Sequence, residues 1–377
     1  MNKYTKNWVV NVIIISLVPI ILVYLPFALK MRSVGVVPIK EPGMYNIVKN
    51  WDGPNYIVVA KSFYEPSKIN QFQYITQPPS YYTAHLPLFP LLIAAFAPVF
   101  GWLYSGVVVN ILFGILLNLL FYTIAKRYTK HPLLLTAVFT IFPARFLSIR
   151  SVIAPETLLV FLMLLSFFLW EKKKYFGAAM AGAIAVFAKV QALFLFPAYA
   201  GALMEGYIKK QTKFKLQQWV IVLIPTSFVL LCGLFYYLTG DFLAFMNAQS
   251  KNGLALSIPF SQFNYSNVWS NTGWLEEVVI YISMFMLLCV SLWKHERREW
   301  FYFAVFYSAF LICLPHRDIT RYAYPLVPLF LFQFSEFFTS KNMKWALLLA
   351  FPAIYLYSIN FILTNQAPII DWMPFVK

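Results

Sequence analysis

The segment NWDGPNY, residues 50–56, places a carboxylate where it could act as a general base. Asp52 stands between Trp51 and a Gly-Pro pair that favours a tight turn. Partial desolvation in such a position raises the basicity of a carboxylate, which suits removal of a proton from a hydroxyl group. Asp52 would equally suit the N-cap of a following helix. Trp51 and Tyr56 are candidates for contacts with the substrate.

Glu156 is the second candidate, in the segment SIRSVIAPETLL that also holds Arg150 and lies shortly after Arg145. One interpretation is that Glu156 faces a cavity and orients a substrate hydroxyl or a basic partner. The alternative is a helix start, because a glutamate in the first turn interacts favourably with the helix dipole. We expect residues 149–156 to form a short turn on the outer face of a membrane.

The segment LPHRDITRYAYPLVP supplies a third group, namely His316, Arg317, Asp318 and Arg321. Arginine forks match phosphate oxygens in bidentate fashion, so two of them beside a bilayer could hold a lipid phosphate. Arg317 and Arg321 are four residues apart and would share one face of a helix. The alternative is interfacial anchoring, in which long basic side chains extend to the membrane surface.

Lys189 and Gln191 interrupt the apolar stretch VFAKVQALF. Ionisable residues at membrane depth are costly and usually face a cavity or a partner, although a position in a short outer turn would remove that cost. We predict that both contact the substrate. His85, at the end of the first long loop, is expected to be a surface histidine and not a ligand.

Cofactor signatures are missing from the sequence. The four histidines and three cysteines do not have metal-ligand spacing, and no phosphate-binding G-x-x-x-x-G-K-[ST] loop is present. We therefore expect neither a metal nor a cofactor.

The elements that position these residues must be membrane helices. Of the 377 residues, 60% are apolar and only 12% are charged, and the mean hydropathy is +0.67. A soluble chain would carry about a quarter charged residues. The net charge of +16 is spread over short clusters between apolar runs, which argues against a nucleic-acid partner and for an all-α integral membrane protein.

Runs of the length that crosses a bilayer occur about eleven times. The predicted spans are residues 8–29, 103–125, 132–148, 157–170, 176–188, 190–207, 219–238, 275–293, 300–314, 322–339 and 345–363. The stretch 176–207 could form two short helices or one broken pair. The eleven predicted spans together make a single polytopic domain over residues 1–377.

Basic residues predict the orientation. With the amino terminus inside, the inner segments hold 17 of the 30 Lys and Arg residues, as the positive-inside rule requires. The long connections, 30–102 and 239–274, then lie outside and are candidates for function. Within the first of these, DGPNYIVVAKSFYE has the spacing of an interfacial helix. Residues 85–100 carry prolines and are predicted to lie at the outer interface without crossing.

Five segments also carry a family resemblance. WDGPNY resembles a W-D-x-x-H/W-Y motif, HLPLFPLL an F-x-P-L-Y-P-L-L motif, and TGDFLAFMNAQ a G-D-P-L-A-F-x-x-A-Q motif. APETLLVFLMLLSFFLW with AGAIAVFAKVQALFLFP resembles the pair Y-x-E-S-L-F and A-x-L-T-R-x-x-G-x-x-L-x-x-P, and RYAYPLVPLF is a looser match. In their order along the chain, these segments resemble the GT-C superfamily of polytopic glycosyltransferases, and within it the PIG-V-like mannosyltransferases. Asn55 stands where that family often has His, and Lys189 where it usually has Arg.

The resemblance implies an inverting hexosyltransferase, with mannose favoured. Its donor would be a polyprenyl-phosphate sugar and its acceptor a glycan, lipid or protein hydroxyl. By this analogy Asp52 is the base, and Arg317, Arg321 and Lys189 balance the departing phosphate. The active face would lie outside the cell membrane of a bacterium, or in the lumen of the endoplasmic reticulum.

Two other functions are compatible with the sequence. A transporter or flippase would also be polytopic and basic, but it would be expected to place ionisable residues near the midplane in repeated halves, and no repeat is visible. A non-catalytic membrane subunit that partners a separate enzyme is the third possibility.

Overall fold

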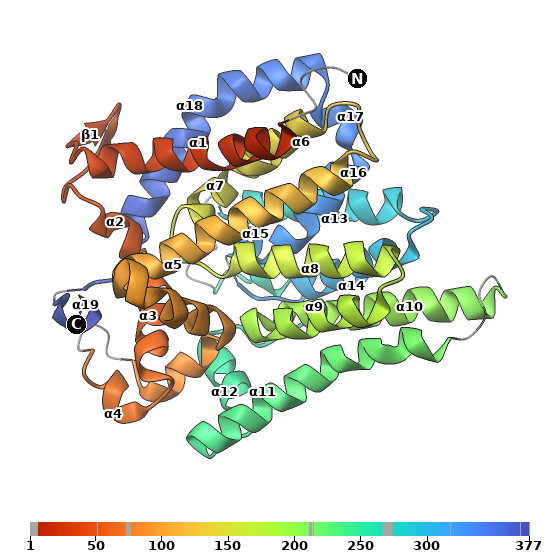
Figure 1. The fold of residues 1–377 in the computed structure, drawn as a ribbon, viewed down its shortest axis with the longest axis horizontal. Helices are drawn as coiled ribbons and strands as arrows, with labels where there is room; N and C mark the ends of the chain where they lie inside the picture. Colours follow the sequence, from red (N-terminus) through yellow and green to blue (C-terminus); the bar gives the residue numbers. More distant parts are fainter. Residues whose placement is uncertain are drawn as a thin grey trace. The chain divides into compact units, whose positions relative to one another are not determined.

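The computed structural model describes residues 7–50, 52–72, 77–210, 213, 215–266, 274–316, 318–369 and 371–376. Trp51 and Arg317 lie outside the described residues. The chain divides into two compact units, Met1–Phe161 with Phe334–Lys377 and Leu162–Gln333. Figure 1 labels the α-helices of both units and the strand β1.

The first unit contains both ends of the chain. Its elements are α1 (Trp8–Ala28), β1 (Ser33–Val34), β2 (Val37–Pro38), α2 (Tyr45–Val48), α3 (Asp52–Ser62), α4 (Pro66–Ile69), η2 (Pro79–Ala84), α5 (Leu88–Ala125), α6 (Pro132–Ile141), α7 (Ala144–Arg150), the start of α8 (Glu156–Glu171), α17 (Ser335–Phe338), α18 (Lys341–Thr364) and α19 (Met373–Val376). The two strands form an antiparallel hairpin.

The second unit contains helices and no strand among its described residues. Its elements are the rest of α8, α9 (Tyr175–Ala188), η3 (Val190–Phe194), α10 (Leu195–Ile208), η4 (Leu216–Val222), α11 (Leu223–Thr239), α12 (Ala244–Lys251), η5 (Ser261–Phe263), α13 (Trp274–Ser291), α14 (Arg298–Ile312), α15 (Ile319–Tyr322), η6 (Tyr324–Leu326) and α16 (Val327–Gln333).

Four helical segments of the described chain are long and apolar enough to cross a membrane, namely Trp8–Ala28, Leu88–Ala125, Leu216–Thr239 and Lys341–Thr364. A bent pair, α6 with α7, could make a fifth. The prediction of an all-α, membrane-embedded protein is therefore confirmed. The remaining predicted spans coincide with helical elements of at most 18 residues, so the count of about eleven stays a prediction.

The helix α5 is interrupted in its first half. Its backbone leaves the helical region at Gly101, with φ 72° and ψ 160°. Glycine adopts such a positive φ without a steric penalty. The bend lies at the boundary between the predicted interfacial segment 85–100 and the predicted span 103–125.

The predicted span 132–148 is not straight. It consists of α6 and α7, whose axes differ by 78°. Pro143 stands between them, and a proline lacks the N–H that would continue the hydrogen bonds of α6. The predicted span 322–339 is likewise divided, into the four short elements α15, η6, α16 and α17.

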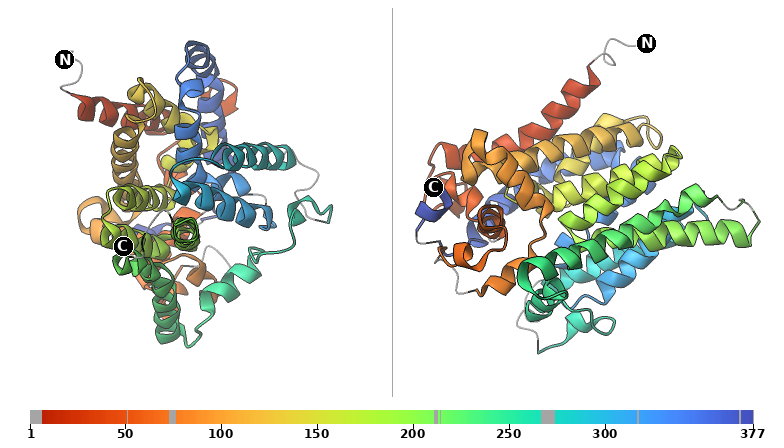
Figure 2. Two further views of the ribbon diagram at one scale, coloured as in Figure 1. Left: turned by 90° about the vertical axis from the view of Figure 1, so that its right-hand side faces the viewer. Right: turned by 60° about the horizontal axis from the view of Figure 1, so that its bottom comes forward.

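The stretch 176–207 forms two antiparallel helices and not one broken span. Gln218, near the start of η4, accepts a hydrogen bond from Tyr207 at the end of α10 (3.2 Å) and donates one to Tyr175 at the start of α9 (3.3 Å). The start of α9 and the end of α10 therefore lie at the same end of this hairpin. Figure 2 shows the green helices α9, α10 and α11 running alongside one another.

A buried chain of polar side chains holds α1, α5 and α7 together. Asn118 on α5 donates to Ser16 Oγ on α1 (2.8 Å) and accepts from Arg150 Nη2 on α7 (2.7 Å). The Arg150 guanidinium also lies 4.8 Å from the ring centroid of Phe146. All three polar residues are at most 3% exposed. These bonds satisfy polar groups that would otherwise be costly inside an apolar unit.

Candidate functional site

Asp52 is the first residue of α3 and contributes a negative charge to its first turn. The helix-start alternative is therefore compatible with the structure, since a carboxylate there interacts favourably with the helix dipole. The neighbouring Gly53 is tightly enclosed. A Cβ at this position would lie 2.7 Å from the Val48 carbonyl oxygen and 3.2 Å from Ile153 Cβ. Only glycine lets α3 begin so close to the segment that leads into α8.

Ile153 fills the space between two glycines of the first unit. A Cβ on Gly106 of α5 would lie 2.6 Å from Ile153 Cγ2. Asn110, one turn further along α5, donates to the carbonyl oxygens of Ile149 (2.8 Å) and Val152 (2.6 Å). The segment that leads to Glu156 is thus held against α5 on one side and against the start of α3 on the other.

Glu156 is the first residue of α8 and is 1% exposed. Arg145 and Arg150 are 4% and 2% exposed, and every residue from 149 to 156 is buried. The predicted short turn is therefore present but buried, and its place on the outer face stays a prediction. Gly106 and Asn110 of α5 hold this segment inside the unit. The contacting residues are about 40 positions apart, so local sequence does not encode the contact.

Tyr56 and His85 form a buried aromatic contact, with ring centroids 4.9 Å apart in an edge-to-face arrangement. His85 also lies 5.4 Å from the Tyr81 ring, and its carbonyl oxygen accepts a hydrogen bond from Tyr64 Oη (2.6 Å). His85 is only 5% exposed, so the expectation of a surface histidine is wrong. The aromatic residues of SYYTAH were the sequence signal that could have indicated a buried histidine.

The end of the chain packs against the same loop. The Ala367 amide donates to the Lys49 carbonyl oxygen (2.8 Å), and Gln366 pairs with Asn50 in an isolated β-bridge. Lys61 Nζ donates to the Pro374 carbonyl oxygen (2.7 Å), and burial lowers the pKa of this lysine. The backbone just before Asp52 is thereby attached to the carboxyl-terminal segment. Nothing in the sequence pattern predicts this contact.

Lys189 belongs to the second unit, where it ends α9 with an extended backbone. Its Nζ lies 5.2 Å from the centroid of the Tyr322 ring, a cation–π contact. The His316 ring meets Tyr322 edge-on at 5.8 Å. Gln191 is 7% exposed, and its Oε1 has no hydrogen-bond partner within the described part of the chain.

Arg321 lies on α15, next to Tyr322. The Arg321 amide donates to the Asp318 carbonyl oxygen (2.9 Å), and the Asp318 amide donates to His316 Nδ1 (3.0 Å). Tyr307 Oη donates to the Tyr322 carbonyl oxygen (2.8 Å), which attaches this turn to α14. The second unit therefore gathers three of its predicted residues, Lys189, His316 and Arg321, around Tyr322.

The predicted residues fall into one group in each unit. In the first, Asp52, Tyr56 and Glu156 flank the contact between α3 and the segment before α8. In the second unit the group consists of Lys189, His316 and Arg321 beside Tyr322, with Gln191 two residues along the chain from Lys189. No set of three or more His, Cys, Asp or Glu residues among those described could hold a metal ion. Comparisons with protein-family models, curated proteins and solved structures found no match to the chain.

Proposed function

We propose that this protein is a membrane glycosyltransferase that moves a hexose, with mannose favoured, from a polyprenyl-phosphate donor to an acceptor hydroxyl. The observation that carries the proposal is the packing of the start of α3, with Asp52, against the segment that enters α8 at Glu156. Both carboxylates belong to motifs that resemble those of the PIG-V-like family. The contact through Gly53 and Ile153 brings those two motifs together within the first unit.

In this mechanism Asp52 accepts the proton of the acceptor hydroxyl as its oxygen attacks the anomeric carbon. The bond from that carbon to the phosphate oxygen breaks on the opposite face, so the configuration inverts and polyprenyl phosphate leaves. The centre passes through an oxocarbenium-like state. Glu156 would orient the acceptor, and Trp51 and Tyr56 would contact the sugar.

The departing phosphate carries negative charge that cations stabilise. Lys189, Arg317 and Arg321 are the proposed cations, with His316 and Gln191 as further polar contacts. Charge-assisted hydrogen bonds to phosphate are stronger than neutral ones, and most so where water is excluded. The cation–π contact of Lys189 with Tyr322 would hold its ammonium group beside this turn.

The same proposal includes about eleven spans and an outer active face. The basic turns at 172–174 and 209–215 would lie inside, and the loops 30–102 and 239–274 would lie outside. This is the orientation that the positive-inside rule favours.

The decisive experiment is Asp52→Asn in the purified, reconstituted protein, assayed with a panel of polyprenyl-phosphate hexoses. Loss of a general base should reduce kcat by roughly a hundred- to ten-thousand-fold without loss of folded protein. Glu65→Gln is the matched control, because Glu65 lies in the same loop, is exposed and pairs only with nearby surface groups. Full transfer by Asp52→Asn contradicts the role of the base, and no transfer by the wild type from any of the donors contradicts the proposed function.

A further inference from the structure

Three polar turns meet at one end of the second unit. They are residues 171–175 between α8 and α9, 208–216 between α10 and η4, and 292–298 between α13 and α14. Gln218 attaches the first turn to the second through its hydrogen bonds with Tyr175 and Tyr207. The turns are therefore one connected surface and not three separate loops.

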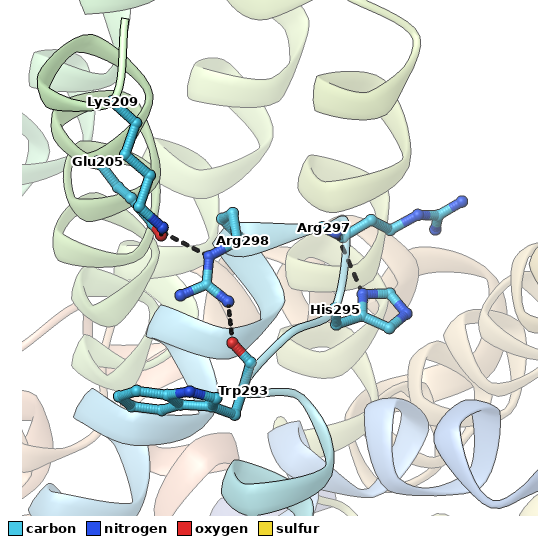
Figure 3. Close-up of polar contacts among 6 residues, drawn as sticks. All are labelled: Glu205, Lys209, Trp293, His295, Arg297 and Arg298. Atoms are coloured by element: carbon cyan, nitrogen blue, oxygen red, sulfur yellow. Dashed lines mark hydrogen bonds and ion pairs between the residues drawn. The ribbon is translucent and has the colours of Figure 1, made fainter. Parts of the chain in front are cut away.

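Ion pairs attach the third turn to the other two. Arg297 Nη2 lies 2.8 Å from Glu171 Oε1 at the end of α8. Arg298 pairs with Glu205 on α10, which also pairs with Lys209 (Figure 3). These contacts neutralise the carboxylates of Glu171 and Glu205 with the two arginines and one lysine.

The other lysines of these turns are exposed and make no ion pair within the part of the chain that the structure describes. They form a surface that we call the lysine rim: Lys172, Lys173, Lys174, Lys210, Lys213, Lys215 and Lys294. Among the described residues of the same turns, Glu296 is the one exposed carboxylate. The rim therefore carries a strong excess of positive charge.

Large apolar side chains are exposed beside these lysines. Ile208 is 78% exposed, Leu216 76%, and Phe176 and Trp293 are each 64% exposed. Leu216 begins the membrane-length segment Leu216–Thr239. Lysines at the end of such a segment, mixed with tryptophan and apolar side chains, are typical of the depth of lipid headgroups.

We propose that the lysine rim binds the phosphate headgroups of anionic phospholipids, with the neighbouring apolar side chains against their acyl chains. The positive charge of the rim and its position at the depth of lipid headgroups both match an anionic phospholipid. A polybasic surface next to a membrane helix attracts anionic lipids, and each lysine near the surface strengthens binding about fivefold. This surface is separate from the residues proposed for sugar transfer.

The test uses the purified full chain in detergent with equimolar dioleoylphosphatidylglycerol and dioleoylphosphatidylcholine, and it counts bound lipid by native mass spectrometry. The wild type should enrich phosphatidylglycerol. The triple variant Lys172→Gln, Lys173→Gln and Lys174→Gln should lower the enrichment about tenfold or more. Added NaCl should also lower it, since exposed charges are screened.

Two controls separate the rim from net charge and from folding. Lys30→Gln, Lys40→Gln and Lys251→Gln remove the same charge from exposed lysines elsewhere and should keep the enrichment. Replacing Lys172, Lys173 and Lys174 by Arg keeps the charge and should also keep it. The proposal would be overturned if the control variant lost as much phosphatidylglycerol enrichment as the rim variant, or if the rim variant lost none. It would also be overturned if millimolar glycerol phosphate displaced the lipid.

Discussion

Glu299 carries a carboxyl group near the ion pairs of the α13–α14 turn. Burial raises its pKa to about 7, against opposing effects from its own backbone amide and from Arg297, while Glu171 and Glu296 raise it further. Below about pH 4.5 the group is protonated in both the folded and the unfolded chain. As the pH rises from there to about 7, the unfolded chain loses the proton first, so the folded state loses stability.

Glu299→Gln should remove this pH dependence. The melting temperature of the variant in detergent should rise relative to that of the wild type as the pH increases from 4.5 to 7, and the difference should stay level above pH 7. Glu296→Gln, at an exposed position in the same turn, is the control and should track the wild type. A constant difference between Glu299→Gln and the wild type across this range would refute the assignment.

Arg150 presents the opposite case, a buried positive charge with no ion-pair partner among the described residues. Its contacts are with Asn118, the Gly114 carbonyl oxygen and two phenylalanine rings. Burying a guanidinium without an ion-pair partner costs free energy. We therefore infer that the hydrogen bonds from Arg150 to α5 help to hold α7 at its angle to α6.

At the scale of elements, the contact of Ile153 with α5 determines where α8 begins. Gly106→Ala would place a methyl group 2.6 Å from Ile153 Cγ2, so the Ile153 side chain or one of the two backbones must shift. Overpacking of this kind costs about 1–3 kcal/mol. We expect a melting temperature several degrees lower, together with reduced transfer activity, because the segment carrying Glu156 is displaced.

Ile153→Ala supplies the internal check on Gly106→Ala. In that background the added methyl group has room, so the second substitution should cost much less than it does in the wild type. Gly233→Ala is the matched control, because a Cβ there meets nothing within 4 Å. Equal costs of Gly106→Ala in both backgrounds would show that Ile153 is not the obstacle.

At the scale of the whole molecule, the proposed topology predicts the side on which each loop is exposed. In a background with Cys232, Cys289 and Cys313 replaced by Ala, Lys251→Cys should react with an impermeant maleimide on intact cells. Lys173→Cys should react only after the cells are permeabilised. Three predicted spans separate the two positions.

The α9–α10 hairpin accounts for two of the three predicted spans between positions 173 and 251. Its two ends lie together at Gln218, so one further crossing, Leu216–Thr239, must separate the lysine rim from residue 251. Labelling of both cysteines on intact cells would contradict the scheme. It would leave the helix assignments unchanged but reverse the sidedness of the later loops.

The positions of the long apolar helices follow from the sequence alone. The predicted spans 8–29 and 345–363 differ from α1 and α18 by only a few residues, and the break before residue 103 coincides with Gly101. Hydropathy over a run of about 20 residues is a local property, so the order of residues suffices to locate a membrane helix. The helix that begins at Asp52 was predictable from a different local signal, the spacing of DGPNYIVVAKSFYE and the aspartate at its start.

The surroundings of the candidate residues depended on the tertiary structure. The sequence predicted a turn at residues 149–156 and a surface position for His85, and the structure buries both. The first is held by Gly106 and Asn110, and the second by Tyr56 and Tyr81. Burial of a polar segment is decided by complementary surfaces on residues distant in the chain, such as the pairing of Gln366 with Asn50, and hydropathy carries no information about such pairs. Local chemistry therefore determined a membrane protein with polar segments between its apolar helices, and only the folded chain decided which of those segments touch.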